Sequence, residues 1–103
     1  MRKSVRVDPE AVEEMAAAMD WYDGERPGLG AEFFDEAREA IRSLERPGVE
    51  CRPVLGVPSD LGAHRKLLRR FPYLVVFVEL EAHIRVLAVA HAKRRPGYWL
   101  ERI

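Results

Sequence analysis

Residues 70–91, RFPYLVVFVELEAHIRVLAVAH, constrain the fold of this chain more than any other stretch. Residues 74–80 and 84–90 are mostly Val, Leu, Ile, Phe and Ala, and the first four fit the pleated surface of a sheet. Only residues 81–83 separate the two runs, and so short a connection joins antiparallel neighbours. The sequence therefore predicts a central β-hairpin. Both strands are apolar at nearly every position, so we expect cover on both faces over part of the sheet, with helices on at least one.

Two amphipathic segments can supply that cover. The first begins at Asp8-Pro9, where Asp8 can cap free backbone amides and Pro9 suits the first helical position, and we expect it to end at Asp23-Gly24. A second helix is predicted over about residues 30–44. The apolar stripe of the first helix consists of Val12, Met15, Met19 and Tyr22, with Ala11 and Ala18 beside them. The stripe of the second helix consists of Phe33, Phe34, Ala37, Ile41 and Leu44. The short connection between them predicts an antiparallel helical hairpin.

Two further segments alternate as strands do. Residues 2–7 predict a half-exposed edge strand, and residues 64–70, HRKLLRR, predict a strand that bends or ends by Pro72. We therefore expect an α+β fold in the order β-α-α-β-β-β, with an antiparallel four-stranded sheet and the N-terminal helical hairpin packed on one face. Val76 and Val78 are predicted to face the helices. The full predicted core is Phe33, Phe34, Ile41, Leu68, Val76, Val78, Val86 and Ala88.

Composition narrows the class of protein. At 103 residues, with 33% charged and 48% hydrophobic side chains, the chain is predicted to be one globular domain, residues 1–103. No apolar run reaches the roughly 20 residues of a membrane-spanning helix, and the first eight residues carry no signal-peptide pattern. We therefore expect a cytoplasmic protein with no membrane partner. Cys51, the one cysteine, excludes an internal disulfide and a cysteine-cluster metal site, and we expect no metal or cofactor.

A net charge of zero conceals a division along the chain. Residues 1–50 hold 7 Lys/Arg and 13 Asp/Glu, whereas residues 51–103 hold 10 and 4. This division predicts surfaces of opposite sign, of which the basic one suits nucleic acid or an acidic protein partner. Three consecutive cations, Lys93, Arg94 and Arg95, follow the last predicted strand and are the strongest binding signal in the sequence.

The order strand, two helices and three strands, with RKLLRRFPYLVVFVE followed by IRVLAVAHAKRRPGYW, resembles the RelE/ParE superfamily of toxins from type II toxin–antitoxin systems, the plasmid stabilisation family. The resemblance covers nearly the whole chain. It implies a growth-inhibiting toxin that a small cognate antitoxin neutralises, in a toxin–antitoxin hetero-oligomer. Some members of this superfamily cleave mRNA on the ribosome, and others resembling ParE poison DNA gyrase by binding.

The ribonuclease pattern of the family maps onto this sequence only in part. Arg94 matches a phosphate-binding arginine of these nucleases, and Tyr98 lies near the position of their C-terminal catalytic tyrosine. Lys66 is a possible equivalent of the lysines that they carry on a strand. The arginine that such nucleases carry after the aromatic at Tyr73 is Leu74 here, with Arg69 or Arg70 as alternative sources of that charge. This departure favours a ParE-like gyrase poison over a metal-independent endoribonuclease. A degenerate member that retains only antitoxin binding is a third alternative.

The candidate site residues differ between these alternatives. A ribonuclease would use His91, Arg94 and Tyr98, with His91 as a candidate general base. His91 can instead hydrogen-bond a backbone group, and Tyr98 and Trp99 can either stack on bases or hold the C-terminal segment on the sheet. A poison that acts by binding would use a target surface made of Arg65, Arg69, Lys93, Arg94, Arg95, Tyr98 and Trp99.

Overall fold

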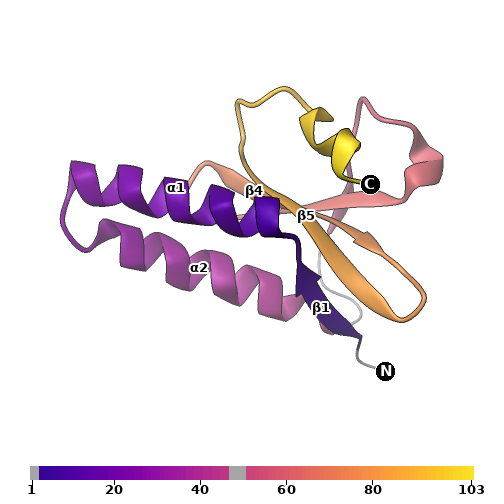
Figure 1. Cartoon of the computed structure of the whole chain (residues 1–103), viewed down its shortest axis with the longest axis horizontal. Coiled ribbons are helices and arrows are strands. Elements are labelled where there is room, and N and C mark those ends of the chain that lie inside the picture. Colours follow the sequence, from indigo (N-terminus) through magenta and orange to yellow (C-terminus); the bar gives the residue numbers. More distant parts are fainter. Residues whose placement is uncertain (1–2, 47–50) are drawn as a thin grey trace.

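The computed structural model describes residues 3–46 and 51–103, which form a helical hairpin packed on a mixed sheet (Figure 1). The helices are α1 (Pro9–Glu25) and α2 (Leu29–Ser43). The strands are β1 (Ser4–Val7), β2 (Arg52–Pro53), β3 (Ala63–Leu67), β4 (Tyr73–Glu79) and β5 (His83–His91). Short 3₁₀ turns, η1 (Ser59–Leu61) and η2 (Tyr98–Arg102), follow β2 and β5. None of the described helices is long and apolar enough to cross a membrane.

The described strands form one sheet in the order β1-β5-β4-β3-β2. The α+β class, the central hairpin and the antiparallel run β3-β4-β5 are confirmed. The prediction of an antiparallel four-stranded sheet is wrong, because β1 pairs with β5 in parallel and β2 adds a fifth strand beside β3. Alternation marks a strand but carries no direction, and a connection through two helices permits parallel pairing. β2 has two residues, one of them proline, too few for any pattern.

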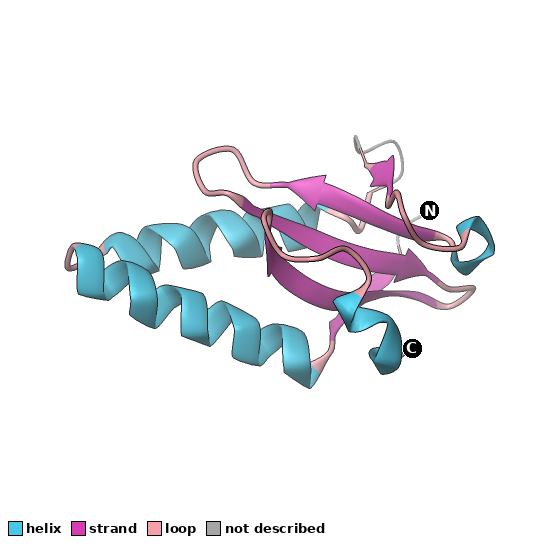
Figure 2. Ribbon diagram, turned by 90° about the horizontal axis from the view of Figure 1, so that it is seen from above, coloured by secondary structure: helices cyan, strands magenta, loops and turns pink. Residues whose placement is uncertain are grey.

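The helical hairpin packs closely because of one glycine. A Cβ atom at Gly30 would lie 2.5 Å from the Met19 carbonyl oxygen, so no larger residue fits between the two helices. The Gly30 N–H also donates to the Asp23 carboxylate across the hairpin at 2.8 Å. Asp23 therefore binds a backbone amide in the first turn of α2. The helix α1 does not end at Asp23-Gly24, as predicted, but continues to Glu25. Figures 1 and 2 both show the turn of the hairpin projecting beyond the end of the sheet.

The start of α1 also differs from the prediction. Asp8 makes no side-chain capping bond to the helix. Its carboxylate instead accepts hydrogen bonds from Arg85 of β5, from Nε at 2.9 and 3.1 Å and from Nη2 at 2.9 Å. A paired guanidinium is a stronger donor for a carboxylate than a backbone amide. Asp8 therefore joins the entry of α1 to the sheet.

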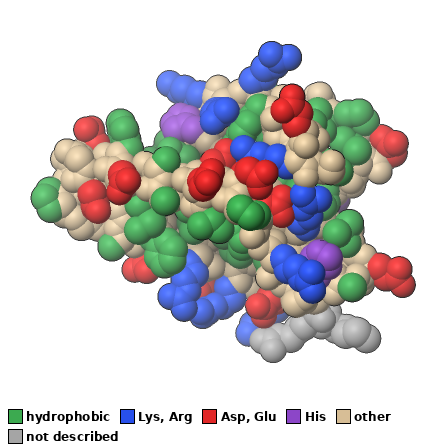
Figure 3. All heavy atoms as spheres, viewed as in Figure 1, with side chains coloured by type: hydrophobic (Ala, Val, Ile, Leu, Met, Phe, Trp, Pro, Cys, Tyr) green, Lys and Arg blue, Asp and Glu red, His purple; other side chains and the backbone are tan. Residues whose placement is uncertain are grey.

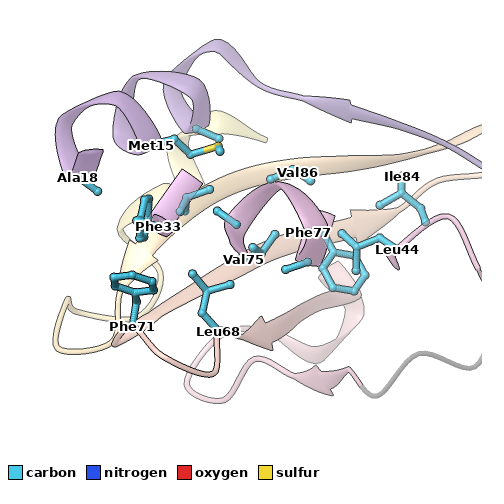
Figure 4. Close-up of a cluster of buried hydrophobic side chains, with 14 of the residues drawn as sticks. Met15, Ala18, Phe33, Leu44, Leu68, Phe71, Val75, Phe77, Ile84 and Val86 are labelled. Carbon is cyan, nitrogen blue, oxygen red and sulfur yellow. The ribbon is translucent and has the colours of Figure 1, made fainter. Parts of the chain in front are cut away.

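Buried side chains form a cluster on each face of the sheet. The helix-facing cluster includes Phe33, Val75, Phe77 and Val86 (Figure 4), and the opposite cluster consists of Ala63, Val76, Val78, Leu87, Ala88 and Trp99. The predicted faces of β4 are therefore reversed: Phe77 points to the helices, and Val76 and Val78 point away. Both sets are buried, so the apolar run did not reveal which residues face the helices.

A β-bulge explains the remaining errors in the predicted core. Val76 pairs with Ala88 and Phe77 pairs with Val86, so Leu87 has no opposite residue in β4. The extra residue shifts the alternation. Val86 therefore faces the helices as predicted, whereas Ala88 lies on the other face. Phe33 and Leu68 are buried in the helix-facing cluster, against which Phe34 and Ile41 are partly buried.

Candidate binding groove

A groove of about 280 Å³ opens on the face of the sheet opposite the helices. Leu74, Val76 and Ala90 of β4 and β5 contribute to its floor. One side is formed by β3 and the segment before it, and the other by the turn after β5 and by η2. The complete lining is Val54, Leu55, Arg65, Leu67, Leu74, Val76, Ala90, His91, Ala92, Arg94, Arg95, Pro96, Tyr98 and Trp99.

This groove brings together most of the site residues predicted from the sequence. Arg65, His91, Arg94, Arg95, Tyr98 and Trp99 all line it. Arg69 lines an adjacent groove of about 410 Å³ with Arg52, Arg65, Lys66 and Leu67, so the two grooves share Arg65. Lys93 is exposed and lines neither groove. Sequence reasoning missed Arg52, Leu55 and Leu67, which carried no signal beyond their charge or hydrophobicity.

Backbone contacts fix the basic turn, by which we mean Lys93, Arg94 and Arg95. The Lys93 N–H donates to Nδ1 of His91 at 3.1 Å, and the Arg94 N–H donates to the His91 carbonyl at 2.9 Å. The His91 ring also makes an edge contact with Tyr73, with the ring centroids 5.1 Å apart. All three cations of the turn are exposed (Figure 3 shows Lys and Arg side chains gathered over the segment after β5).

Glu14 of α1 holds the C-terminal segment in place. Its carboxylate accepts the Tyr98 hydroxyl at 2.5 Å and Arg102 Nη1 at 3.0 Å, and it accepts the Val89 N–H at 3.0 Å. Arg102 Nη1 also donates to the Leu87 carbonyl at 2.8 Å. Because β1 ends at Val7, opposite Val86, the backbone of β5 beyond that pair lacks a neighbouring strand on this side. We call Glu14, Tyr98 and Arg102 the tail anchor; it satisfies the polar groups of this edge.

Tyr98 is held as a neutral phenol. Burial and the hydrogen bond to Glu14 raise the pKa of Tyr98 well above its usual value. The Arg94 guanidinium lies over the Tyr98 ring at 3.8 Å from the centroid, and Arg102 lies at 5.2 Å. The ring thus joins the basic turn to the tail anchor through cation–π contacts.

Trp99 has no open surface, because its side chain is 2% exposed and packs with Val76 and Leu87 on the sheet. The other two histidines lie away from the groove. The His64 Nδ1 donates to the Gly62 carbonyl at 3.0 Å, and His83 begins β5. In the part of the chain that the structure describes, no three His, Cys, Asp or Glu side chains are placed to hold a metal ion.

The acidic helices bind cations of the second half of the chain. Glu32 pairs with Arg70 at 2.6 Å, and the Glu36 carboxylate accepts the backbone N–H groups of Arg69 and Arg70. In contrast, no carboxylate among the described residues forms an ion pair with a guanidinium group that lines the two grooves, namely that of Arg52, Arg65, Arg69, Arg94 or Arg95.

Fold and groove together define a small α+β protein with a basic, partly apolar groove on the sheet face opposite its helical hairpin. No family model and no curated protein matches the chain. Among solved structures, it is similar to a chain of the "Chromosomal ParDE TA system from P. aeruginosa", with a TM-score of 0.76 and 18% identity over 87% of this chain and 96% of that chain. The protein therefore shares the fold of a chain from a toxin–antitoxin system, which agrees with the sequence resemblance.

Proposed function

We propose that this protein is the toxin of a type II toxin–antitoxin system and that it acts, like ParE, by binding and poisoning DNA gyrase. The ParE-like fold supports the toxin assignment. The target surface in this proposal is the groove with Arg65, Arg94, Arg95 and Tyr98, extended by Arg69 and Lys93. Trp99 supports that surface from below, because it is buried beneath it.

The chemical state of the groove carries the preference for binding over catalysis. The Tyr98 hydroxyl is engaged by Glu14, and Nδ1 of His91 is engaged by the Lys93 amide. The Tyr98 hydroxyl and one ring nitrogen of His91 are thus occupied in structural contacts. In contrast, the guanidinium groups of the groove arginines have no carboxylate partner in the described part of the chain and remain available to a binding partner.

The antitoxin is proposed to bind beside the helical hairpin, on the other side of the molecule. Val12 and Trp21 of α1 are 52% and 61% exposed, which is large for apolar side chains on a helix that also packs on a sheet. An antitoxin segment that covers them would raise the soluble yield on co-expression. The two proteins should then co-purify, and failure to do so would contradict the toxin–antitoxin assignment.

Induced expression tests the gyrase proposal. A gyrase poison should cause filamentation with DNA-damage signalling, whereas a ribonuclease should arrest translation with cleaved messages. The double change Arg94→Glu and Arg95→Glu should relieve toxicity, and His91→Gln should leave most of it intact. Arg38→Glu is the matched control, because Arg38 is an exposed cation of α2 outside the groove.

The alternative is a RelE-like ribosome-dependent ribonuclease, and one observation favours it: His91, Arg94 and Tyr98 line the same groove. Loss of a positioned acid or base costs on the order of a hundredfold in rate. Under this alternative, His91→Gln or Tyr98→Phe alone would therefore rescue growth while ribosome binding persists. A protein that co-purifies with its antitoxin but has no effect on growth would be a degenerate member.

A further inference from the structure

We propose that the groove binds an acidic segment of the target protein, which inserts an aliphatic side chain between β3 and the basic turn. This inference rests on the proposed function, since it names the chemistry of the target segment. It differs from the antitoxin surface, which is proposed to lie beside the helical hairpin.

The size and floor of the groove favour an inserted side chain. Its volume of about 280 Å³ is just below the range of roughly 300–1,000 Å³ that is typical of small-molecule sites. Leu67 and Leu55 are 53% and 76% exposed at its edge, and Leu74 and Val76 lie beneath them. A branched aliphatic side chain from a partner would bury this apolar surface, which water covers in the isolated protein.

The rim of the groove favours carboxylates beside that side chain. Arg65 lies on one side and Arg94 and Arg95 on the other, and Arg52 and Arg69 extend the positive charge into the adjacent groove. None of the residues that line either groove is acidic. Other arginines of the described chain, such as Arg70, Arg85 and Arg102, have carboxylate partners within the protein. The unpaired cations thus complement Asp or Glu residues that flank an apolar anchor.

The aromatic side chains make a nucleic acid a poorer fit. Proteins that bind single strands stack bases on open aromatic rings, in addition to binding phosphates. Here Trp99 is buried, and Arg94 covers the Tyr98 ring. The exposed surface between the arginines is aliphatic, which suits a polypeptide side chain better than a base.

Selection from a phage-displayed library of random heptapeptides on the purified protein tests this inference without assuming a sequence. We expect enriched peptides with Leu, Ile or Met flanked by Asp or Glu. A synthetic fluorescent copy of the enriched peptide is then titrated by anisotropy against the protein and its variants, beside single-stranded DNA and RNA octamers.

Matched substitutions locate the binding site. Arg65→Glu and Leu67→Ser should each weaken the peptide by roughly tenfold, the scale of residues central to an interface. Arg38→Glu and Leu80→Ser should change its affinity by less than about twofold, because they remove an exposed cation and a 41%-exposed leucine outside the groove. Both groove variants should still co-purify with the antitoxin.

Three outcomes would overturn the inference: no acidic–aliphatic consensus, tighter and steeply salt-dependent binding of the octamers, or loss of antitoxin co-purification in the groove variants. Gyrase poisoning that persists although Arg65→Glu and Leu67→Ser weaken peptide binding as expected would also overturn it, while the assignment as a gyrase poison would stand. If the peptide consensus appears but induced cells show no gyrase poisoning, the groove chemistry is supported and the proposed function fails.

Discussion

Removing Glu14 should destabilise the protein far more than its position on a surface helix suggests. Glu14→Ala leaves the Arg102 guanidinium without a carboxylate and frees the Tyr98 hydroxyl and the Val89 N–H at once. Breaking a buried ion pair costs about 3–5 kcal/mol. Because the Glu14 and Arg102 side chains remain 16% and 17% exposed, we expect a somewhat smaller loss, about 2–4 kcal/mol.

Chemical denaturation and thermal melting measure this loss. The expected loss is a large part of the total stability of such domains, which is about 5–15 kcal/mol. The melting temperature should fall by on the order of 10–25 °C, in proportion to the loss in free energy of unfolding. Glu13→Ala is the matched control: Glu13 is the exposed neighbour, and the change should stay within about 0.5 kcal/mol. A double-mutant cycle of Glu14→Gln with Arg102→Gln should give a coupling energy of roughly 1–3 kcal/mol.

A fluorescence measurement separates local release of the C-terminal segment from global unfolding. The chain has two tryptophans, the exposed Trp21 and the buried Trp99. In a Trp21→Phe background, Glu14→Ala should shift the Trp99 emission to the red at denaturant concentrations where the helices remain folded. Equal stabilities for Glu14→Ala and Glu13→Ala, with no such shift, would refute the reasoning and show that Trp99 packing alone holds the segment.

Two other predictions concern the helical hairpin and Tyr98. Gly30→Ala should lower the free energy of unfolding by about 1–3 kcal/mol, because its Cβ atom would clash with the Met19 carbonyl. In Gly24→Ala the Cβ atom would meet nothing within 4 Å, so this change should raise the free energy of unfolding by up to about 1 kcal/mol. Urea denaturation of both variants measures these differences. The pKa of Tyr98 is raised in the folded state, so the folded protein retains a proton that the unfolded chain releases near pH 10. The contribution of Tyr98 to the free energy of unfolding should therefore be fully present below about pH 10 and decrease above it. In an alkaline denaturation series, Tyr98→Phe should make the loss of stability with rising pH less steep.

Local patterns were sufficient to predict the helices and the strand meander. The second helix was expected over about residues 30–44 and spans Leu29–Ser43, because its apolar stripe repeats at helical spacing. In the first helix, Ala11, Met15, Ala18 and Tyr22 of the predicted stripe are buried, whereas Val12 is 52% exposed. Val12 lies at the border of the stripe, and hydrophobicity alone did not show that it is exposed.

Sheet direction and strand faces could not be read from the sequence. A period of two in residues 3–7 is the same for parallel and antiparallel pairing, so only the spatial neighbour, β5, decides the direction of β1. Residues 84–90 are apolar on both faces, so neither the bulge at Leu87 nor the reversed faces of β4 left a trace in the pattern. Burial of both faces was predicted correctly, and that burial is what hid the register.

The groove was predictable in part for a different reason. The basic turn follows a strand directly, so its position at a sheet edge required no long-range knowledge. The tail anchor joins residues that are 84 and 88 positions apart, and no local pattern indicates such a pair. Whether Glu14 belongs to a solvated helix face or to a buried network depends on the fold alone.

Long-range pairing also determines which part of the surface is basic. Ion pairs join the two halves of the chain at Asp8–Arg85, Glu14–Arg102 and Glu32–Arg70, so the acidic helices neutralise cations of the second half. Arg65 and the basic turn lie on the sheet face that the helices do not cover, and no helical carboxylate pairs with them in the described structure. Composition therefore predicted a basic half, but the fold concentrates the unpaired charge in a groove with an aliphatic floor. A partner must satisfy both properties of this groove, which is why we expect selectivity for acidic apolar segments over polyanions in general.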